Sequence, residues 1–187
     1  ERPERAKGSL GKYAPLDDEG ATLLGPAQWA WLEAQLRAPA EVRLIASSGQ
    51  VVADEKGMDE WGNYPRERER LFDLIATTGA NGVVFLSGNA HFAEISVTDE
   101  GPYPLHDFTS SGLTHVNEAY ADAPNRHRCS GPFADLNFGL VEIDWENGSS
   151  PAVTLRAIGL DGRAAFEMKL LGDELLSGRA SSEGTHS

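Results

Sequence analysis

Apolar residues recur at helical spacing in two stretches of this 187-residue chain. A first helix is expected to begin at Gly25-Pro26, because proline suits the first turn, and to end before Pro39. Its inner face is formed by Trp29, Leu32 and Leu36. A second helix is expected to end at a cap on Gly79, with an inner face formed by Leu71, Leu74, Ile75 and Thr78. The alternating charges of residues 66–70 are expected to face solvent.

Short apolar runs between turn residues predict the strands. Residues 42–46 and 83–86 flank the second helix, so they fit a βαβ unit with parallel strands. Further strands are expected at residues 92–97, 138–145, 153–158 and 164–170. Glu146-Asn147-Gly148 is a hairpin signal, whereas residues 100–135 are rich in Gly, Pro, Ser and Asn and are expected to be mostly loop. The predicted fold class is α/β (α+β): one βαβ unit followed by an antiparallel meander.

Charge narrows the classes of partner. The formal net charge is −13, which argues against binding to nucleic acid or to anionic membrane surfaces. An anionic phosphate substrate would need a local cationic site, which metal ions can supply. Cys129 is the only cysteine, so an intrachain disulfide is excluded. The sequence has no apolar run that approaches the roughly 18 residues of a membrane span.

The strongest chemical signal follows the strand at residues 83–86. Ser87 and Gly88 end this strand, and Asn89 and His91 come directly after it. Glycine allows the backbone to turn sharply, and a carboxamide oxygen and an imidazole can both bind a metal ion. The segment therefore predicts a metal-binding loop. The alternative interpretation is a strand end that carries an incidental histidine.

Six segments carry a family resemblance, and they occur in the same order as in that family. They are LGPAQWAWL (24–32), VRLIASSGQ (42–50), WGNYPRER (61–68), SGNAHFAE (87–94), FTSSGLTH (108–115) and NFGLVEIDW (137–145). Together they resemble the C-terminal half of the alkaline phosphatase D-like enzymes, which are calcineurin-type metallophosphoesterases. The resemblance runs from about residue 10 to about residue 165.

The resemblance implies part of a metallophosphatase-type β-sandwich flanked by helices, with metal ions held at one rim. Most metal ligands of that family lie in an N-terminal half, upstream of the matching segments. Residues 21–171 are therefore expected to form the C-terminal half of such a domain, with an exposed sheet edge and an exposed apolar face. Residues 1–20 are expected to be an extended lead-in, and residues 172–187 a disordered tail.

Gly88-Asn89-Ala90-His91 occupies the place where the resembling family has Gly-Asp-x-His. The resemblance therefore implies that His91 is a metal ligand and catalytic, and that Asn89 is a second ligand. Asn89 departs from the pattern, because its amide oxygen can bind a hard cation but brings no charge. The implied cofactors are divalent or trivalent ions of the Ca, Fe or Zn class. Glu94 is a candidate partner of the site, although a plain strand-end carboxylate explains it as well.

Four further residues are candidates for the substrate rim. Gln50 closes the segment that ends the strand at residues 42–46. The alternative interpretation is that Gln50 is an ordinary turn residue. Trp61 and Tyr64 lie in a loop that is near the active site in the resembling enzymes, and core packing would also explain them. His115 follows a run of hydroxyl residues and is a candidate peripheral site residue.

These features predict a metal-dependent phosphoric ester hydrolase of which this chain supplies the C-terminal part. The expected partners are a phosphate ester substrate and the missing N-terminal half, either in the same chain or in a partner chain. The resemblance suggests an exported protein. The alternative function is a non-catalytic binding or assembly module that works by pairing with a partner chain.

Overall fold

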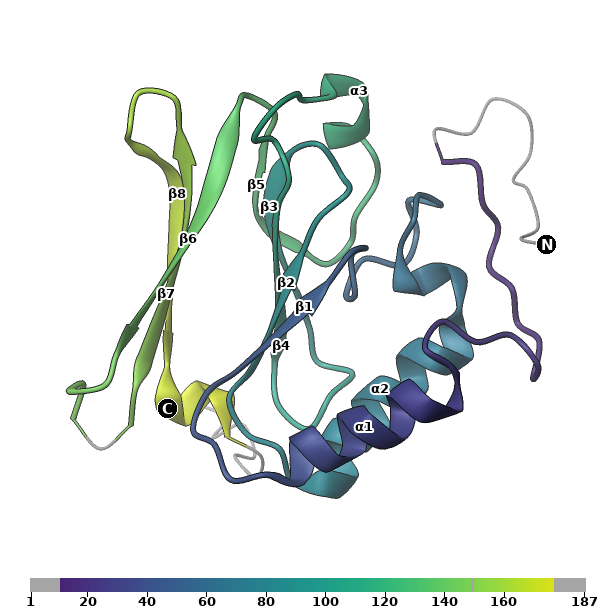
Figure 1. The fold of residues 1–187 in the computed structure, drawn as a ribbon. Coiled ribbons are helices and arrows are strands. Elements are labelled where there is room, and N and C mark those ends of the chain that lie inside the picture. The colour runs from purple at the N-terminus through teal and green to yellow at the C-terminus, as the bar shows by residue number, and fades with distance from the viewer. Residues whose placement is uncertain (1–10, 149, 177–187) are drawn as a thin grey trace, which may run out of the picture.

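The computed structural model describes residues 11–148 and 150–176. It is built in three layers, with a three-stranded sheet, a five-stranded sheet and a pair of helices stacked on one another (Figure 1). This arrangement confirms the predicted mixed α/β fold. Among the described residues, no helix combines the length and the apolar character that crossing a bilayer would require.

The elements follow one another along the chain with these bounds: α1 (Gly25–Arg37), β1 (Arg43–Ser47), the 3-10 helix η1 (Trp61–Asn63), α2 (Pro65–Thr78), β2 (Val83–Ser87), β3 (Ala93–Thr98), β4 (Leu105–Ser110), α3 (Glu118–Ala121), β5 (Arg128–Phe133), β6 (Asn137–Asp144), β7 (Ala152–Gly159), β8 (Ala164–Leu171) and the 3-10 helix η2 (Gly172–Leu175).

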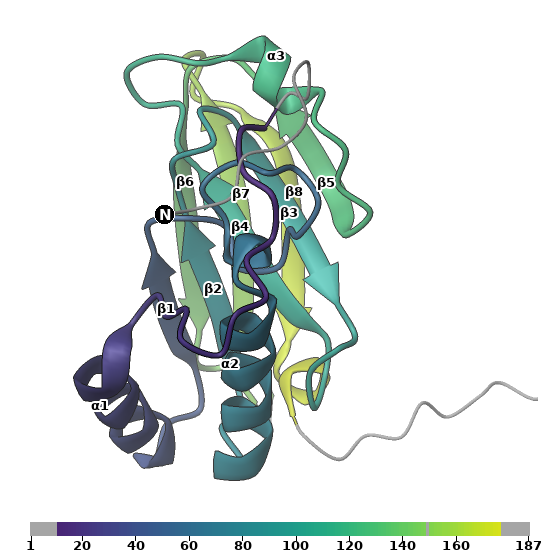
Figure 2. The same cartoon turned by 90° about the vertical axis from the view of Figure 1, so that its right-hand side faces the viewer.

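Both long helices are formed as the apolar spacing predicts. Helix α1 starts at Gly25 with proline in its first turn, and its buried residues are Trp29, Leu32 and Leu36. Helix α2 ends at Gly79, whose φ of 65° is left-handed, a conformation that glycine adopts without steric cost. The two helices lie side by side on one face of the five-stranded sheet (Figure 2).

The charged start of α2 is not wholly solvated, which corrects the prediction for Glu67 and Arg68. The Glu67 carboxylate accepts hydrogen bonds from Trp29 Nε1 at 2.9 Å and from Leu23 N at 3.0 Å. The Arg68 guanidinium donates to the backbone oxygens of Val51 at 3.1 Å and Val52 at 2.9 Å. Both side chains are buried because they satisfy polar groups on α1 and on the loop after β1.

The five-stranded sheet has the strand order β1-β2-β4-β3-β5. Strands β1, β2 and β4 are parallel, and α2 connects β1 to β2, which confirms the βαβ unit. Ser47, Ser87 and Thr109 lie side by side at the carboxyl ends of these strands. The loops that follow β1, β2 and β4 therefore begin at the same edge of the sheet, where ligands bind in many parallel sheets.

The expectation that residues 100–135 are mostly loop is wrong. This stretch contains β4, the short helix α3 and β5, and β4 lies at the centre of the sheet. The strand was missed because it carries His106, Asp107 and Thr109, which break any apolar run although all three are buried. The side chains of Asp107 and Thr109 accept hydrogen bonds from distant parts of the chain, whereas His106 Nδ1 has no partner among the described residues.

Strands β6, β7 and β8 form the predicted antiparallel meander. The chain then continues into η2, where Leu175 is buried, so the prediction of a disordered tail is wrong for residues 172–175. Residues 177–187 of that tail lie outside the described part of the chain. In the expected lead-in, residues 11–20 run in an extended path, with Tyr13 N donating to Gly57 O at 2.9 Å. Its first ten residues are also outside the described part.

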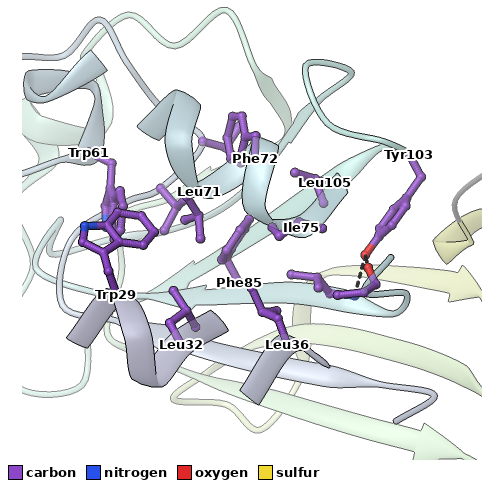
Figure 3. Packing of buried hydrophobic residues seen from close by; sticks show 14 residues of the cluster. Trp29, Leu32, Leu36, Trp61, Leu71, Phe72, Ile75, Phe85, Tyr103 and Leu105 are labelled. Atoms are coloured by element: carbon purple, nitrogen blue, oxygen red, sulfur yellow. Dashed lines mark hydrogen bonds between the residues drawn. The ribbon is translucent and has the colours of Figure 1, made fainter. Parts of the chain in front are cut away.

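Two apolar layers hold the fold together. The first lies between the helices and the five-stranded sheet, where Trp29 and Trp61 pack at one end and Tyr103 at the other (Figure 3). The Tyr103 hydroxyl donates to Ala80 O at 2.7 Å and accepts from Val83 N at 3.1 Å, so its polar end is satisfied. The second layer lies between the two sheets and includes Val84, Ile95, Phe108, Val153, Leu155 and Leu170.

Edge strands β1 and β6 lie on the same side of the molecule (Figure 2). Apolar side chains on these strands are partly open to solvent, with exposed fractions of 43% for Leu44, 48% for Phe138 and 39% for Leu140. Trp145, just after β6, is also exposed. Leu44, Phe138, Leu140 and Trp145, which lie on or next to these two edge strands, are together called the open edge below. It matches the expectation of an exposed sheet edge with apolar side chains.

Candidate active site

The loop after β2 has an unusual backbone. Asn89 has a φ of 65° and His91 a φ of 60°, and among the described residues no other non-glycine residue has a positive φ. The sequence suggested that Gly88 makes the sharp turn. In the structure the turn is made by Asn89 and His91 instead. Asparagine and histidine tolerate this left-handed region better than most residues, but it remains sparsely populated. Such conformations persist only where the surroundings impose them, and they concentrate at functional sites.

The His91 ring packs against two other rings. Its ring centre is 4.1 Å from that of His115, with an angle of 63° between the planes. The Tyr120 ring centre lies 6.1 Å from it, with a much smaller angle of 25° between the planes. The structure therefore brings together His91 and His115, which are 24 positions apart in the sequence.

Hydrogen bonds tie the loop after β2 to the segment after β4. His91 N donates to Ser111 Oγ at 2.8 Å, and Ser111 N donates to Phe92 O at 3.2 Å. Asn117 N donates to His91 O at 3.1 Å. These contacts account for the strained backbone, because both the amide and the carbonyl of His91 are held by the neighbouring segment.

A cavity of about 330 Å³ adjoins this loop at Asn89. Its lining residues are Leu23, Ser48, Gly49, Asp59, Glu60, Trp61, Tyr64 and Asn89. The cavity brings Trp61 and Tyr64 together with Asn89, whereas His91 and His115 are not among its lining residues. Asp59 and Glu60 make the lining acidic, so the cavity favours a cation. It would repel a phosphate group that is not accompanied by a bound cation.

Trp61 serves the core as well as the cavity. Its Nε1 donates to Ser47 Oγ at 3.0 Å, and its ring meets that of Trp29 edge to face, with centres 6.3 Å apart. The two interpretations of Trp61, core residue and rim residue, are therefore compatible. Tyr64 precedes α2, and its backbone oxygen accepts hydrogen bonds from the amides of Glu67 and Arg68 at 3.0 Å.

Gln50 does not reach the cavity with its side chain, which corrects its prediction as a rim residue. Its Nε2 donates to Glu94 Oε1 at 2.7 Å and to Thr109 Oγ1 at 2.8 Å, and its Oε1 accepts from Lys56 Nζ at 2.7 Å. A carboxamide has only two N–H donors, and both are used inside the protein. Gln50 therefore anchors the loop after β1 and has no donor left for a substrate.

Beneath the site lies a group of buried charges that the sequence did not reveal. Glu94, fully buried in β3, accepts hydrogen bonds from Gln50, Lys56, Asn125 and Arg128. Burial alone would raise the Glu94 pKa, but the charges and hydrogen bonds of Lys56 and Arg128 outweigh it and hold the pKa below its usual value. Burial also lowers the Lys56 pKa, against the opposing effect of Glu94. The candidate role of Glu94 is thus to secure Gln50 and Lys56 under the loops.

Asp107 is the other buried carboxylate below the loops. Its Oδ2 accepts hydrogen bonds from Val51 N at 2.6 Å and Val52 N at 3.0 Å, and its Oδ1 accepts from Ser87 Oγ at 2.6 Å. Complete burial raises the Asp107 pKa, although these hydrogen bonds oppose the rise. Asp107 therefore joins the loop after β1 to the end of β2. Its signal in the sequence is an acidic residue between the apolar Leu105 and Phe108.

A second cluster of potential metal ligands lies apart from the histidine pair. Ligand atoms of Asp54, Glu100 and His127 all lie within 4.8 Å of one another. However, Arg126 Nη2 approaches Asp54 Oδ2 at 2.5 Å, and Arg68 pairs with Glu100. These guanidinium groups already neutralise the carboxylates, so the cluster is explained as an ion-pair network and not as a metal site.

The fold and this edge define the chain as part of a metallophosphatase-type α/β sandwich. A profile of the PhoD-like phosphatase family matches residues 2–127, and the chain belongs to that family. Among solved structures it is similar to one titled "Structure of PhoD", with a TM-score of 0.56 and 20% sequence identity. That match covers 90% of this chain but only 40% of the PhoD chain. No curated protein matched the sequence.

Proposed function

We propose that the protein containing this chain is a metal-dependent phosphoric ester hydrolase, in which His91 and Asn89 help to hold the metal ions. The observation that carries the proposal is the left-handed backbone at both residues, at the edge where β1, β2 and β4 end. Membership of a phosphatase family gives this strained loop a chemical context.

The donors present fit a metal ion of the proposed kind. Among the described residues, none forms a hydrogen bond to the His91 ring, so its nitrogens are open to a ligand. Imidazole suits zinc and iron, whereas the amide oxygen of Asn89 suits a hard cation such as Ca²⁺. Bound ions of this class would polarise phosphoryl oxygens and activate water. Asp59 and Glu60 would favour cations in the adjacent cavity.

Two donors are too few for the proposed site, so other parts of the protein complete it. The chain spans 40% of the length of the PhoD structure that it matches. We assign the remaining ligands to segments outside this chain, in the same polypeptide or in a partner. The open edge is where those segments would pack, because Leu44, Phe138 and Leu140 are apolar and partly exposed there.

The experiment compares the 187-residue chain with the complete protein. Each is assayed with a chromogenic phosphomonoester and a phosphodiester at alkaline pH, in the presence of Ca²⁺, Fe³⁺ or Zn²⁺. We expect hydrolysis by the complete protein and none by the chain alone. A complete protein that hydrolyses neither substrate with any of these ions would contradict the proposal. It would favour the other candidate, a non-catalytic module that uses the open edge to pair with a partner.

A further inference from the structure

We propose that His115 is a second imidazole ligand to the ion held by His91, and that this pair selects a transition metal at that position. The inference rests on the proposed function and makes it more specific, because it assigns one metal position to the zinc and iron class. It also gives His115 a different role from the substrate contact that its place in the sequence suggested.

The geometry of the two rings carries the inference. Two imidazoles bound to one ion at about 2.0–2.1 Å each have ring centres roughly 4.5 Å apart at a right-angled ligand angle and about 5.2 Å apart at the tetrahedral angle. The observed separation of 4.1 Å is roughly 0.4–1.1 Å shorter, so the two side chains would rotate apart to admit an ion. The contact joins two polar rings at the protein surface, because His91 is only partly buried and His115 is exposed. Apolar burial therefore does not explain why they meet.

The nitrogen atoms are free in the way that ligation requires. His115 Nδ1 lies 3.3 Å from Thr114 Oγ1, which can fix the tautomer and leave Nε2 as the ligand atom. Within the described ranges, 11–148 and 150–176, the His91 ring packs against two other rings and forms no hydrogen bond. Both side chains can therefore bind an ion without first breaking a strong contact.

The backbone holds the pair together before any ion binds. Ser111 Oγ accepts from His91 N, and Asn117 N donates to His91 O, so both residues that flank the His115 segment contact His91 directly. Tyr120 packs against the His91 ring, with an angle of 25° between the planes. A preorganised pair loses less conformational freedom on binding than two independent side chains would.

Ligand chemistry then predicts which ions bind. Imidazole nitrogen favours Zn²⁺, Co²⁺, Fe and Cu, whereas Ca²⁺ takes oxygen ligands almost entirely. A pair of imidazoles should therefore bind Zn²⁺ and Co²⁺ in preference to Ca²⁺. The rest of the coordination is left to water and to the other groups of the proposed site.

The test measures metal binding and does not depend on catalysis. Zn²⁺ affinity is determined by calorimetry, and Co²⁺ binding by its visible absorption, for the 187-residue chain and three variants. His115→Phe and His91→Phe keep a ring for packing but remove the nitrogens. His127→Gln is the matched control, because it removes a histidine from the cluster with Asp54 and Glu100. Circular dichroism checks that each variant is folded, and His115→Ala replaces His115→Phe if the larger ring disturbs the loop.

We expect His115→Phe and His91→Phe each to weaken Zn²⁺ binding by roughly ten-fold or more, since even residues that only orient a ligand change affinity by about that factor. His127→Gln should leave it unchanged. If His91→Phe weakens binding and His115→Phe does not, the inference about His115 is wrong while the proposed role of His91 stands. Failure of the wild-type chain to bind Zn²⁺ would overturn the inference about the histidine pair. Wild-type affinity in both phenylalanine variants would overturn the assigned roles of both His115 and His91.

Discussion

Lys56 and Glu94 form an ion pair in which both side chains are completely inaccessible to solvent. Lys56 belongs to the loop between β1 and α2, and Glu94 to β3, so the pair joins segments that are 38 residues apart in the sequence. Lys56 also lies over the Phe92 ring at 4.9 Å, next to the loop that carries His91. The pair thus connects the core to the base of the candidate site.

Lys56→Met should destabilise the protein strongly. Removing one member of a buried ion pair typically costs about 3–5 kcal/mol, because the remaining charge is left without compensation. We expect the lower end, about 3 kcal/mol, because Arg128 still pairs with Glu94. Urea denaturation measures the change. The control is Arg37→Met in the exposed pair with Glu33, which should change stability by less than about 0.5 kcal/mol. Equal effects of the two variants would show that the buried pair has no special role.

Stability should fall as the solution becomes mildly acidic, and His106 should contribute to that fall. Burial lowers the His106 pKa in the folded protein below the ordinary value of 6.5, which applies to the unfolded chain. At pH values between the lowered pKa and 6.5, the unfolded chain therefore binds a proton more readily than the folded protein does. The contribution of His106 is therefore complete above about pH 6.5 and is lost as the pH falls below it. Urea midpoints at several pH values from 7.5 to 5 (roughly the range in which histidine titrates) should decline less in His106→Gln than in the wild type. Parallel declines would show that His106 does not contribute.

The open edge should give the 187-residue chain an exposed apolar surface that binds other apolar groups. We expect it to bind a hydrophobic dye or to self-associate, because apolar side chains of β1 and β6 are exposed. Leu140→Lys should reduce either effect. Leu160→Lys is the control, since Leu160 is more exposed but lies in the turn between β7 and β8. A monomeric chain without dye binding, or an equal effect of the two lysine substitutions, would contradict the assignment of this edge as a packing surface.

In the complete protein, Asn89→Asp should strengthen metal binding. The two side chains have nearly the same shape, and both tolerate the left-handed backbone at this position. A charged oxygen ligand interacts more strongly with a cation, by about 1–3 kcal/mol in a partly dehydrated site. Calorimetric metal affinities provide the measurement. Asn147→Asp adds the same charge in the distant β6–β7 turn, and an equal gain from both variants would indicate a general effect of charge.

Much of the fold could be predicted because local patterns agree with the final packing. The prediction of helices α1 and α2 was correct because their apolar residues repeat along one face and because Gly79 caps α2. The prediction of the β6–β8 meander was correct because its antiparallel strands are joined by turns that can be recognised in the sequence. Strand β4 was missed because Asp107 and Thr109 are buried against partners elsewhere in the chain, and the pattern of a single segment does not reveal such pairing.

Part of the candidate site could likewise be predicted from the sequence, and part could not. Asn89 and His91 follow a strand directly, so their place at the carboxyl edge could be predicted from the sequence. Gln50 was misassigned, because a strand-end position does not reveal that Lys56 and Glu94 draw its amide inward. The contact between His91 and His115 depends on how two loops meet, which only the three-dimensional structure defines.

Metal content per protein molecule tests the central claim most directly. The complete protein is purified as the wild type, as His91→Ala and as the control His127→Ala, and each is analysed for bound elements. We predict that the wild type and the control contain the same amount of metal, and that His91→Ala loses bound metal together with phosphatase activity. Unchanged metal content and activity in His91→Ala would mean that the loop after β2 is not the metal site.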